Sequence, residues 1–65
     1  MIRLEVFKNL RKIKKMMRKC RITFYHIGPS LELAEKVKNA LSKTGYKVEI
    51  VKGNIVPNYA LIIEK

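Results

Sequence analysis

The sequence contains no aspartate, no glutamine and no tryptophan, and it has a single cysteine (Cys20) and a single histidine (His26). One cysteine excludes a disulfide within the chain and a metal site built from several cysteines. Metal sites and acid–base pairs are built from clusters of His, Cys, Asp and Glu, and no such cluster is visible along the chain. We therefore expect a protein that is not an enzyme and that uses no cofactor and no metal.

Long apolar segments are also lacking. No run approaches the roughly 20 residues of a membrane span, and the N-terminus does not resemble a signal peptide. We therefore expect a soluble, cytoplasmic protein. The 65 residues suffice for one small domain, residues 1–65, and a hydrophobic content of 48% can supply its core. The lysine-rich, glutamine-free composition is typical of a thermophile.

Two short strands are predicted at the end of the chain. Residues 46–52 alternate apolar and polar side chains with period two, and residues 59–63 are a second run of β-forming residues. The Gly, Pro and Asn residues between these runs indicate a turn, which is too short for a parallel crossover. The two strands are therefore predicted to form an antiparallel hairpin.

A helix is predicted over residues 30–44, after a strand at 22–27. Ser30 is the expected N-cap, and Gly45 suits the left-handed position just beyond the helix. Apolar residues recur on one face of this helix at Leu33, Val37, Ala40 and Leu41. Together, residues 22–52 predict a β–α–β unit whose two strands are parallel.

The first 21 residues allow two interpretations. From Leu10 onward, apolar and basic residues occupy separate arcs of a helical wheel, of about 120° and about 160°. Extending this helix to the N-terminus would place Leu4 and Phe7 on the basic side, whereas residues 2–7 alternate as a strand does. We therefore predict a strand at 2–7 and a helix at about 9–19. The alternative is one long N-terminal helix.

The preferred element order is β–α–β–α–β–β. It predicts an α/β fold, a two-layer sandwich with a four-stranded mixed sheet and two helices on one face. The alternative order, with a long N-terminal helix, is α–β–α–β–β. The covered face of the sheet is expected to carry Ile2, Leu4, Val6, Ile22, Phe24, Val48, Ile50, Leu61 and Ile63. The open face is expected to carry Arg3, Glu5, Thr23, Tyr25, Lys47, Glu49 and Glu64.

Several segments resemble the SirA/TusA-type sulfur-carrier proteins. Residues 44–49 (TGYKVE) and 59–65 (YALIIEK) are similar to the closing strands of that family, and residues 27–30 (IGPS) are similar to its strand-to-helix turn. The preferred element order is the one that this family uses, and it also resembles the RNA-binding C-terminal domain of translation initiation factor 3. The resemblance implies a carrier or regulatory protein. The family's Cys-Pro-x-Pro motif is absent, because residues 7–10 (FKNL) stand in its place and Cys20 lies at the other end of the helix.

Positive charge is concentrated in the first third of the chain. Residues 1–21 contain nine Lys and Arg against one Glu, whereas residues 22–65 contain six Lys against four Glu. A solvated helix usually intersperses Glu with Lys, and this segment does not. Because such a face attracts polyanions, we predict electrostatic binding of nucleic acid, RNA or DNA. The predicted binding residues are Arg11, Lys12, Lys14, Lys15, Arg18 and Lys19. The alternatives are an acidic protein, an anionic membrane surface or a face that is merely solvated.

Three further features allow a functional and a structural interpretation. Gly28 and Ser30 form a candidate anion site, since they precede the free amides at the start of a helix, but an ordinary capped turn explains them equally. Cys20 falls on the apolar arc of the first helix and is expected to be a buried thiol. His26 is expected to lie partly buried at the end of its strand.

Exposed apolar residues on the open sheet face predict self-association. This face is expected to include Tyr25, Ile27, Val51 and Ile62. A homodimer, formed through the open face or through the free edge of the last strand, would cover them.

Overall fold

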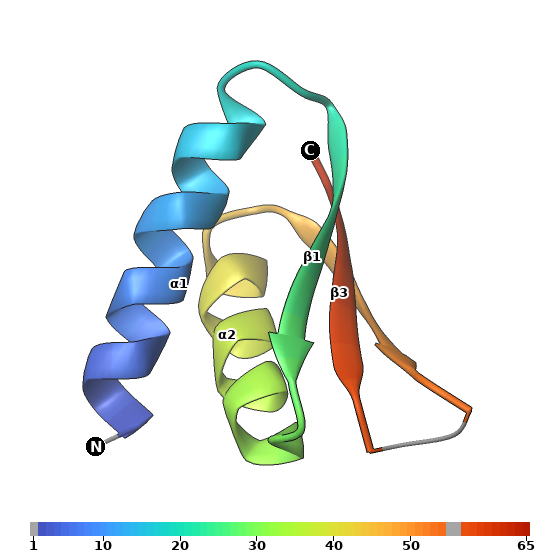
Figure 1. Cartoon of the computed structure of the whole chain (residues 1–65). Helices are drawn as coiled ribbons and strands as arrows, with labels where there is room; N and C mark the ends of the chain where they lie inside the picture. Colours follow the sequence, from blue (N-terminus) through green and yellow to red (C-terminus); the bar gives the residue numbers. More distant parts are fainter. Residues whose placement is uncertain (1, 55–56) are drawn as a thin grey trace.

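The computed structural model describes residues 2–54 and 57–65, with the side chain of Ile2 excepted. It forms two layers, with both helices packed on one face of a sheet (Figure 1). The α/β class and the placement of two helices on one face agree with the prediction. The elements, in chain order, are α1 (Ile2–Met17), β1 (Ile22–Gly28), α2 (Leu31–Lys43), β2 (Lys47–Lys52) and β3 (Tyr59–Glu64).

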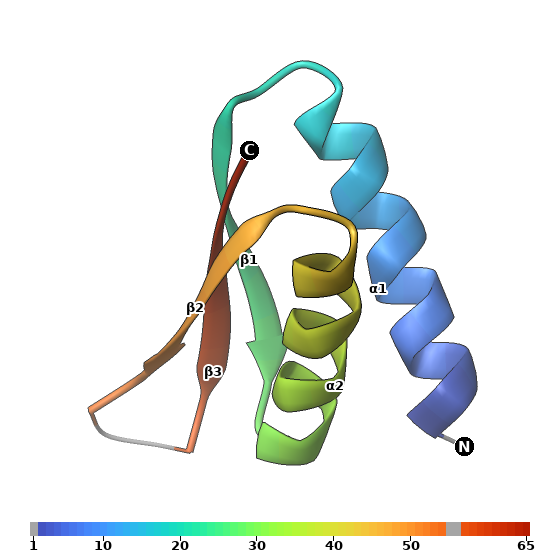
Figure 2. The ribbon, with the colours of Figure 1, turned by 180° about the vertical axis from the view of Figure 1, so that it is seen from behind.

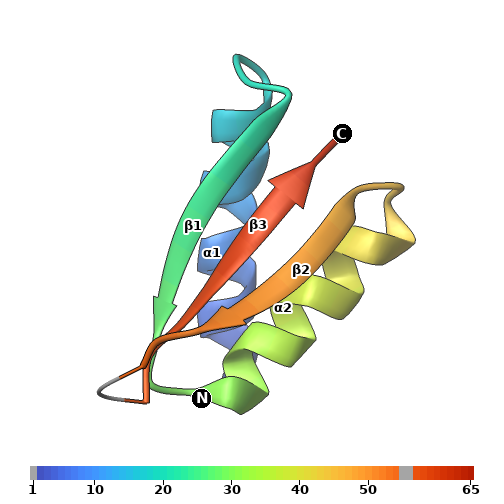
Figure 3. The same ribbon diagram turned by 90° about the vertical axis from the view of Figure 1, so that its right-hand side faces the viewer.

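The described strands form a three-stranded sheet in the order β1-β3-β2. β3 is antiparallel to both neighbours, which confirms the predicted hairpin of β2 and β3. β1 and β2 are therefore parallel, as predicted for the β–α–β unit, but β3 lies between them (Figure 3). The expected free edge of the last strand is wrong, because β3 is central and the edges are β1 and β2.

The predicted strand at residues 2–7 is wrong, and so is the four-stranded sheet. These residues are the first turns of α1, which continues to Met17, so that the order is the alternative α–β–α–β–β. An apolar stripe at Val6, Leu10, Ile13 and Met17 has continuous helical spacing and packs into or against the core. The long helix had been disfavoured because it exposes Leu4 and Phe7, and these side chains are indeed 63% and 62% exposed.

The two faces of β1 are the reverse of the prediction. Tyr25 and Ile27 pack against the core, whereas Ile22 and Phe24 are 57% and 61% exposed on the open face. Both faces of this strand are apolar, so its alternation alone does not determine which one is covered. The pairing with β3 determines the covered face, because Tyr25 lies opposite the fully buried Leu61.

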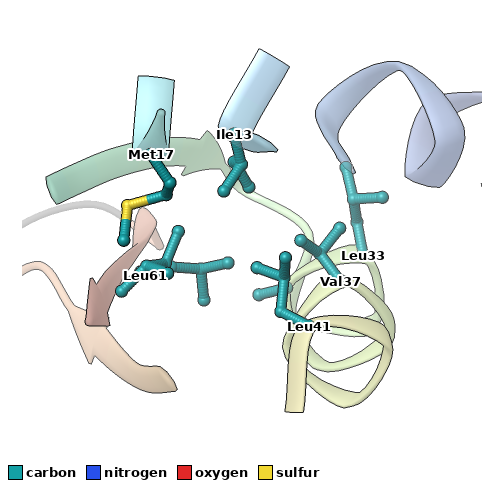
Figure 4. Close-up of a cluster of buried hydrophobic side chains, with 8 residues drawn as sticks. Ile13, Met17, Leu33, Val37, Leu41 and Leu61 are labelled. Carbon is teal, nitrogen blue, oxygen red and sulfur yellow. The ribbon is translucent and has the colours of Figure 1, made fainter. Parts of the chain in front are cut away.

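The core lies between the two helices and the sheet (Figures 2 and 4). Val48 and Ile50 of β2 lie against it on the covered face, as predicted, while Lys47, Glu49 and Glu64 are exposed. Burying each large aliphatic side chain contributes roughly 1.5–3 kcal/mol, which is substantial for so small a domain. The buried cluster contains Ile13, Met17, Leu33, Ala34, Val37, Leu41, Leu61 and Ile63.

The ends of α2 agree with the prediction. Ser30 is the N-cap, and its Oγ accepts a hydrogen bond from the Leu33 amide at 3.1 Å. Gly45 follows the helix with a φ of +98°, in the left-handed region that favours glycine. Leu33 and Leu41 are buried on the inner face, while the predicted core residue Ala40 is only half-buried.

Candidate nucleic-acid interface

α1 presents its basic residues to solvent because its apolar stripe faces the core. Ile13 and Met17 are fully buried, and the intervening basic residues are all exposed. The charge order also suits the helix, since Glu5 lies in the first turn and Lys14 and Lys15 lie in the last. Negative charge near the N-terminus and positive charge near the C-terminus stabilise the helix dipole.

Five of the six predicted binding residues surround one open depression on the outer face of α1. Its volume is about 390 Å³. The sixth residue, Lys19, lies beyond the end of the helix, where its amide donates to the Met16 carbonyl at 3.1 Å. The lining residues are Arg11, Lys12, Lys14, Lys15 and Arg18.

Counter-charges are missing from this face. In the described part of the chain, the one ion pair within 4 Å joins Lys36 and Glu32, at 3.7 Å on α2. The acid on α1, Glu5, lies at the other end of the helix, near its N-terminus. Each pair of like charges four residues apart, such as Arg11 and Lys15, destabilises a helix by a few tenths of a kcal/mol. The face therefore retains a repulsion that a bound polyanion would relieve.

One side-chain hydrogen bond links α1 to the sheet, and a second, within α1, holds the acceptor of the first. The Tyr25 hydroxyl on β1 donates to Oδ1 of Asn9 at 2.6 Å, and Nδ2 of Asn9 donates to the Glu5 carbonyl at 2.6 Å. Burial raises the pKa of the Tyr25 phenol, so the hydroxyl stays protonated and keeps its role as donor. The prediction placed Tyr25 on the open face, and this link was missed.

An apolar end adjoins the basic part of α1. Leu4 and Phe7 are exposed, and Phe7 also borders a groove of about 290 Å³ between α1 and α2. Because these residues precede the basic depression along the same helix, the outer surface of α1 has an apolar end and a cationic end. The groove is lined by Arg3, Val6, Phe7, Leu10 and Lys36.

The candidate anion site at Gly28 and Ser30 forms the turn between β1 and α2. The Ser30 hydroxyl oxygen already accepts from the Leu33 amide. Gly28 is buried and has a φ of +118°, a conformation that a residue with a side chain rarely adopts. The geometry of the turn explains both residues, and anion binding there stays a prediction.

The expectations for Cys20 and His26 are wrong. Cys20 is exposed, because α1 ends at Met17 and the thiol lies in the connection to β1, beyond the apolar arc. His26 is also exposed, since the side chains on its side of β1 face the open side of the sheet. Within residues 2–54 and 57–65, no three His, Cys, Asp or Glu side chains are grouped as metal ligands. In the same residues, neither helix has the length and apolar character needed to cross a membrane.

Comparison with known proteins gave no significant match to a family model, a curated protein or a solved structure. The element order that the SirA/TusA resemblance implies begins with a strand, whereas this chain begins with α1.

Proposed function

We propose that this protein is a non-enzymatic nucleic-acid-binding protein that binds phosphates through the outer face of α1. The observation that carries the proposal is the set of five cationic side chains around one depression, with no acidic side chain among them. Phosphate contacts release condensed counterions, and this release supplies most of the affinity of sequence-independent binders.

The dimensions of α1 suit a nucleic-acid duplex. The segment from Arg11 to Arg18 is about 10 Å long at 1.5 Å per residue, which suffices for contact with about four phosphates. A helix about 10–12 Å across also fits the major groove of B-DNA, which is about 12 Å wide. The lining side chains are all Lys or Arg, which bind phosphate oxygens, and the binding that we propose follows the backbone without selecting a sequence.

An anionic membrane surface is a second candidate, favoured by the exposure of Leu4 and Phe7. Interfacial helices insert apolar side chains while their basic residues meet lipid headgroups. Such helices present apolar side chains along their length. On α1, the most exposed apolar side chains, Leu4 and Phe7, lie near the N-terminus; Met16, further along, is 38% exposed, but the depression there is lined by cations alone. Nucleic acid is therefore the preferred ligand.

Two alternative functions would require different features of the chain. A SirA/TusA-like carrier or regulatory role would have to do without the family's cysteine motif, and any sulfur chemistry would need the thiol of Cys20, which is exposed after α1. An acidic protein could dock on the same cations without contacting Cys20. Under our proposal, Cys20→Ser leaves nucleic-acid affinity unchanged, which separates phosphate binding from sulfur chemistry.

The test removes two charges from the depression and two from elsewhere. Lys12→Gln/Lys15→Gln acts on α1, and the matched control Lys43→Gln/Lys52→Gln acts at the ends of α2 and β2, where both lysines are exposed. Lys36 is not a suitable control, because it is paired with Glu32. Binding is measured by fluorescence anisotropy at 100 mM salt with a labelled DNA duplex and a structured RNA. Loss of two phosphate contacts should lower affinity about 60-fold, and the control should change it little.

Anionic and neutral lipid vesicles form a further arm of this experiment. If neither duplex DNA nor RNA binds below roughly 100 µM at low salt, where sequence-independent binders normally register, the proposal is wrong. Binding to anionic vesicles alone would replace it with the membrane alternative. Equal losses in the two double variants would mean that only net charge matters and that α1 is not the interface.

A further inference from the structure

Apolar side chains are exposed on the side of the sheet that faces away from both helices. Figure 3 views this side of the sheet, with the helices behind it. Phe24 and Ile22 are 61% and 57% exposed on β1. The strand register continues this surface across the sheet, because Phe24 pairs with Ile62, and Ala60 pairs with Val51 on the other side. We call this surface the open-face patch; it consists of the exposed Ile22 and Phe24, the half-buried Val51 and Ile62, and the buried Ala60 between them.

The charges beside the patch differ from those of the rest of the surface. The chain has a net charge of +10 and only five acidic residues, two of which, Glu49 and Glu64, lie on this face. Lys47 lies in the same row of the sheet as Glu64. The open face therefore carries both signs of charge, whereas α1 carries mostly one.

The charges on the open face favour a second copy of the chain over nucleic acid as its binding partner. Glu49 and Glu64 would repel nucleic acid, and sheet surfaces that bind RNA use two or three aromatic side chains, whereas the open-face patch has only Phe24. A second copy meets no such obstacle, since a face with both signs can complement itself. The other exposed apolar pair, Leu4 and Phe7, has one acid, Glu5, beside it, but it adjoins the basic depression of α1, so two copies meeting there would bring like charges together.

The size of the face sets the strength of the contact. Three strands of six or seven residues cover roughly 20 Å by 14 Å at standard strand spacing. With the side chains at its margin, this corresponds to roughly 500 Å² per subunit, or about 1,000 Å² in total, the lower end of specific interfaces. Interfaces of this size are typical of weak, transient complexes, so we expect dimerisation only at concentrations above about 10 µM.

We propose that the open-face patch is the interface of a homodimer in which the two sheets pack face to face. The dimer is isologous, so Phe24 and Ile62 of each subunit are covered by the same surface of the other. Because the helices lie on the far side of each sheet, the dimer presents its two α1 helices on opposite outer surfaces. It can then bridge two nucleic-acid segments, a consequence that rests on the proposed function.

Two phenylalanines of nearly equal exposure provide a matched pair of variants. Phe24→Glu places a charge in the open-face patch, and Phe7→Glu places the same charge on α1, where Phe7 is 62% exposed. Sedimentation equilibrium without nucleic acid is measured from about 10 µM to about 1 mM. The wild type and Phe7→Glu should rise from 7.6 kDa towards twice that mass. Phe24→Glu should remain closer to the monomer mass at every concentration, with the dissociation constant raised at least about tenfold.

Circular dichroism verifies that each variant is folded, and Ile22→Glu serves as a second variant on the same face. A wild type that is monomeric at about 1 mM overturns the proposal, and so does equal dissociation by Phe7→Glu and Phe24→Glu. The dependence on salt distinguishes dimerisation from the proposed binding of phosphates. Added salt screens repulsion between two +10 chains and strengthens the dimer, whereas it weakens phosphate binding.

Discussion

Removal of one hydroxyl group tests how α1 is held in place. In Tyr25→Phe, Oδ1 of Asn9 loses the donor that now lies at 2.6 Å, while the apolar contacts of the ring remain. A hydrogen bond of this kind contributes about 0.5–1.5 kcal/mol, and Asn9 is only half-buried, so water can partly replace the donor. We expect a loss of about 1 kcal/mol from a total stability of roughly 3–10 kcal/mol for 65 residues.

A double-mutant cycle isolates this bond from other effects. Asn9→Ala alone removes the acceptor but also replaces a poor helix former with the best one, a gain of about 0.5 kcal/mol or more. The single variant can therefore look nearly neutral. The cycle with Tyr25→Phe cancels this gain and should give a coupling energy of about 1 kcal/mol. Urea denaturation followed by circular dichroism at 222 nm measures all four proteins. Additivity within about 0.3 kcal/mol would refute the link between β1 and α1.

The stability difference between the wild type and Tyr25→Phe should depend on pH. Burial raises the pKa of Tyr25 in the folded state above its ordinary value of about 10. The contribution of the hydroxyl is therefore fully present below pH 10 and is lost as pH rises through the folded pKa. The stability difference between the wild type and Tyr25→Phe should accordingly shrink above pH 10, and a difference that grew there would contradict the assignment. The comparison cancels the parallel loss of charge from the lysines.

A pair of variants tests the core, and alkylation of Cys20 tests where α1 ends. Ile13→Ala should lower the free energy of unfolding by about 2–4 kcal/mol, because Ile13 is fully buried between the helices and the sheet. Met16→Ala changes an exposed position on the same helix and should lower it much less. Cys20 should react with iodoacetamide in the native protein about as fast as in urea, since its thiol is exposed, and protection in the native protein would contradict the end of α1 at Met17.

The correctly predicted elements are those whose signals are local. Ser30 and Gly45 delimit α2 through their own backbone preferences, and the alternation of residues 47–52 needs only the strand itself. The turn residues between β2 and β3 leave room for nothing but a hairpin. In each case a few neighbouring residues contain the whole signal.

The errors arose where a distant partner decides the outcome. Residues 2–7 alternate like a strand, but no described strand pairs with them, and Val6 instead extends the apolar stripe of α1. In β1 both faces are apolar, and the pairing of Tyr25 with the buried Leu61 selects the covered one. Neither choice can be read from the segment alone.

Part of the candidate site could likewise be predicted from the sequence, and part could not. Charge segregation along α1 is visible in the sequence, and five of the six residues that it indicated line the depression, while Lys19 does not. The hydrogen bond between Tyr25 and Asn9 joins residues 16 positions apart and has no sequence signature. The exposure of Cys20 depends on where α1 ends, and no Gly or Pro marks that position.

The salt dependence of binding to a labelled DNA duplex tests the proposed function most directly. Contact with about four phosphates predicts a slope of log affinity against log salt near −3.6 for the wild type between about 50 and 300 mM. Lys12→Gln/Lys15→Gln removes two of these contacts and should reduce the slope to about −1.8, while Lys43→Gln/Lys52→Gln should keep the wild-type value. A wild-type slope near zero, or an unchanged slope in Lys12→Gln/Lys15→Gln, would contradict phosphate binding by α1.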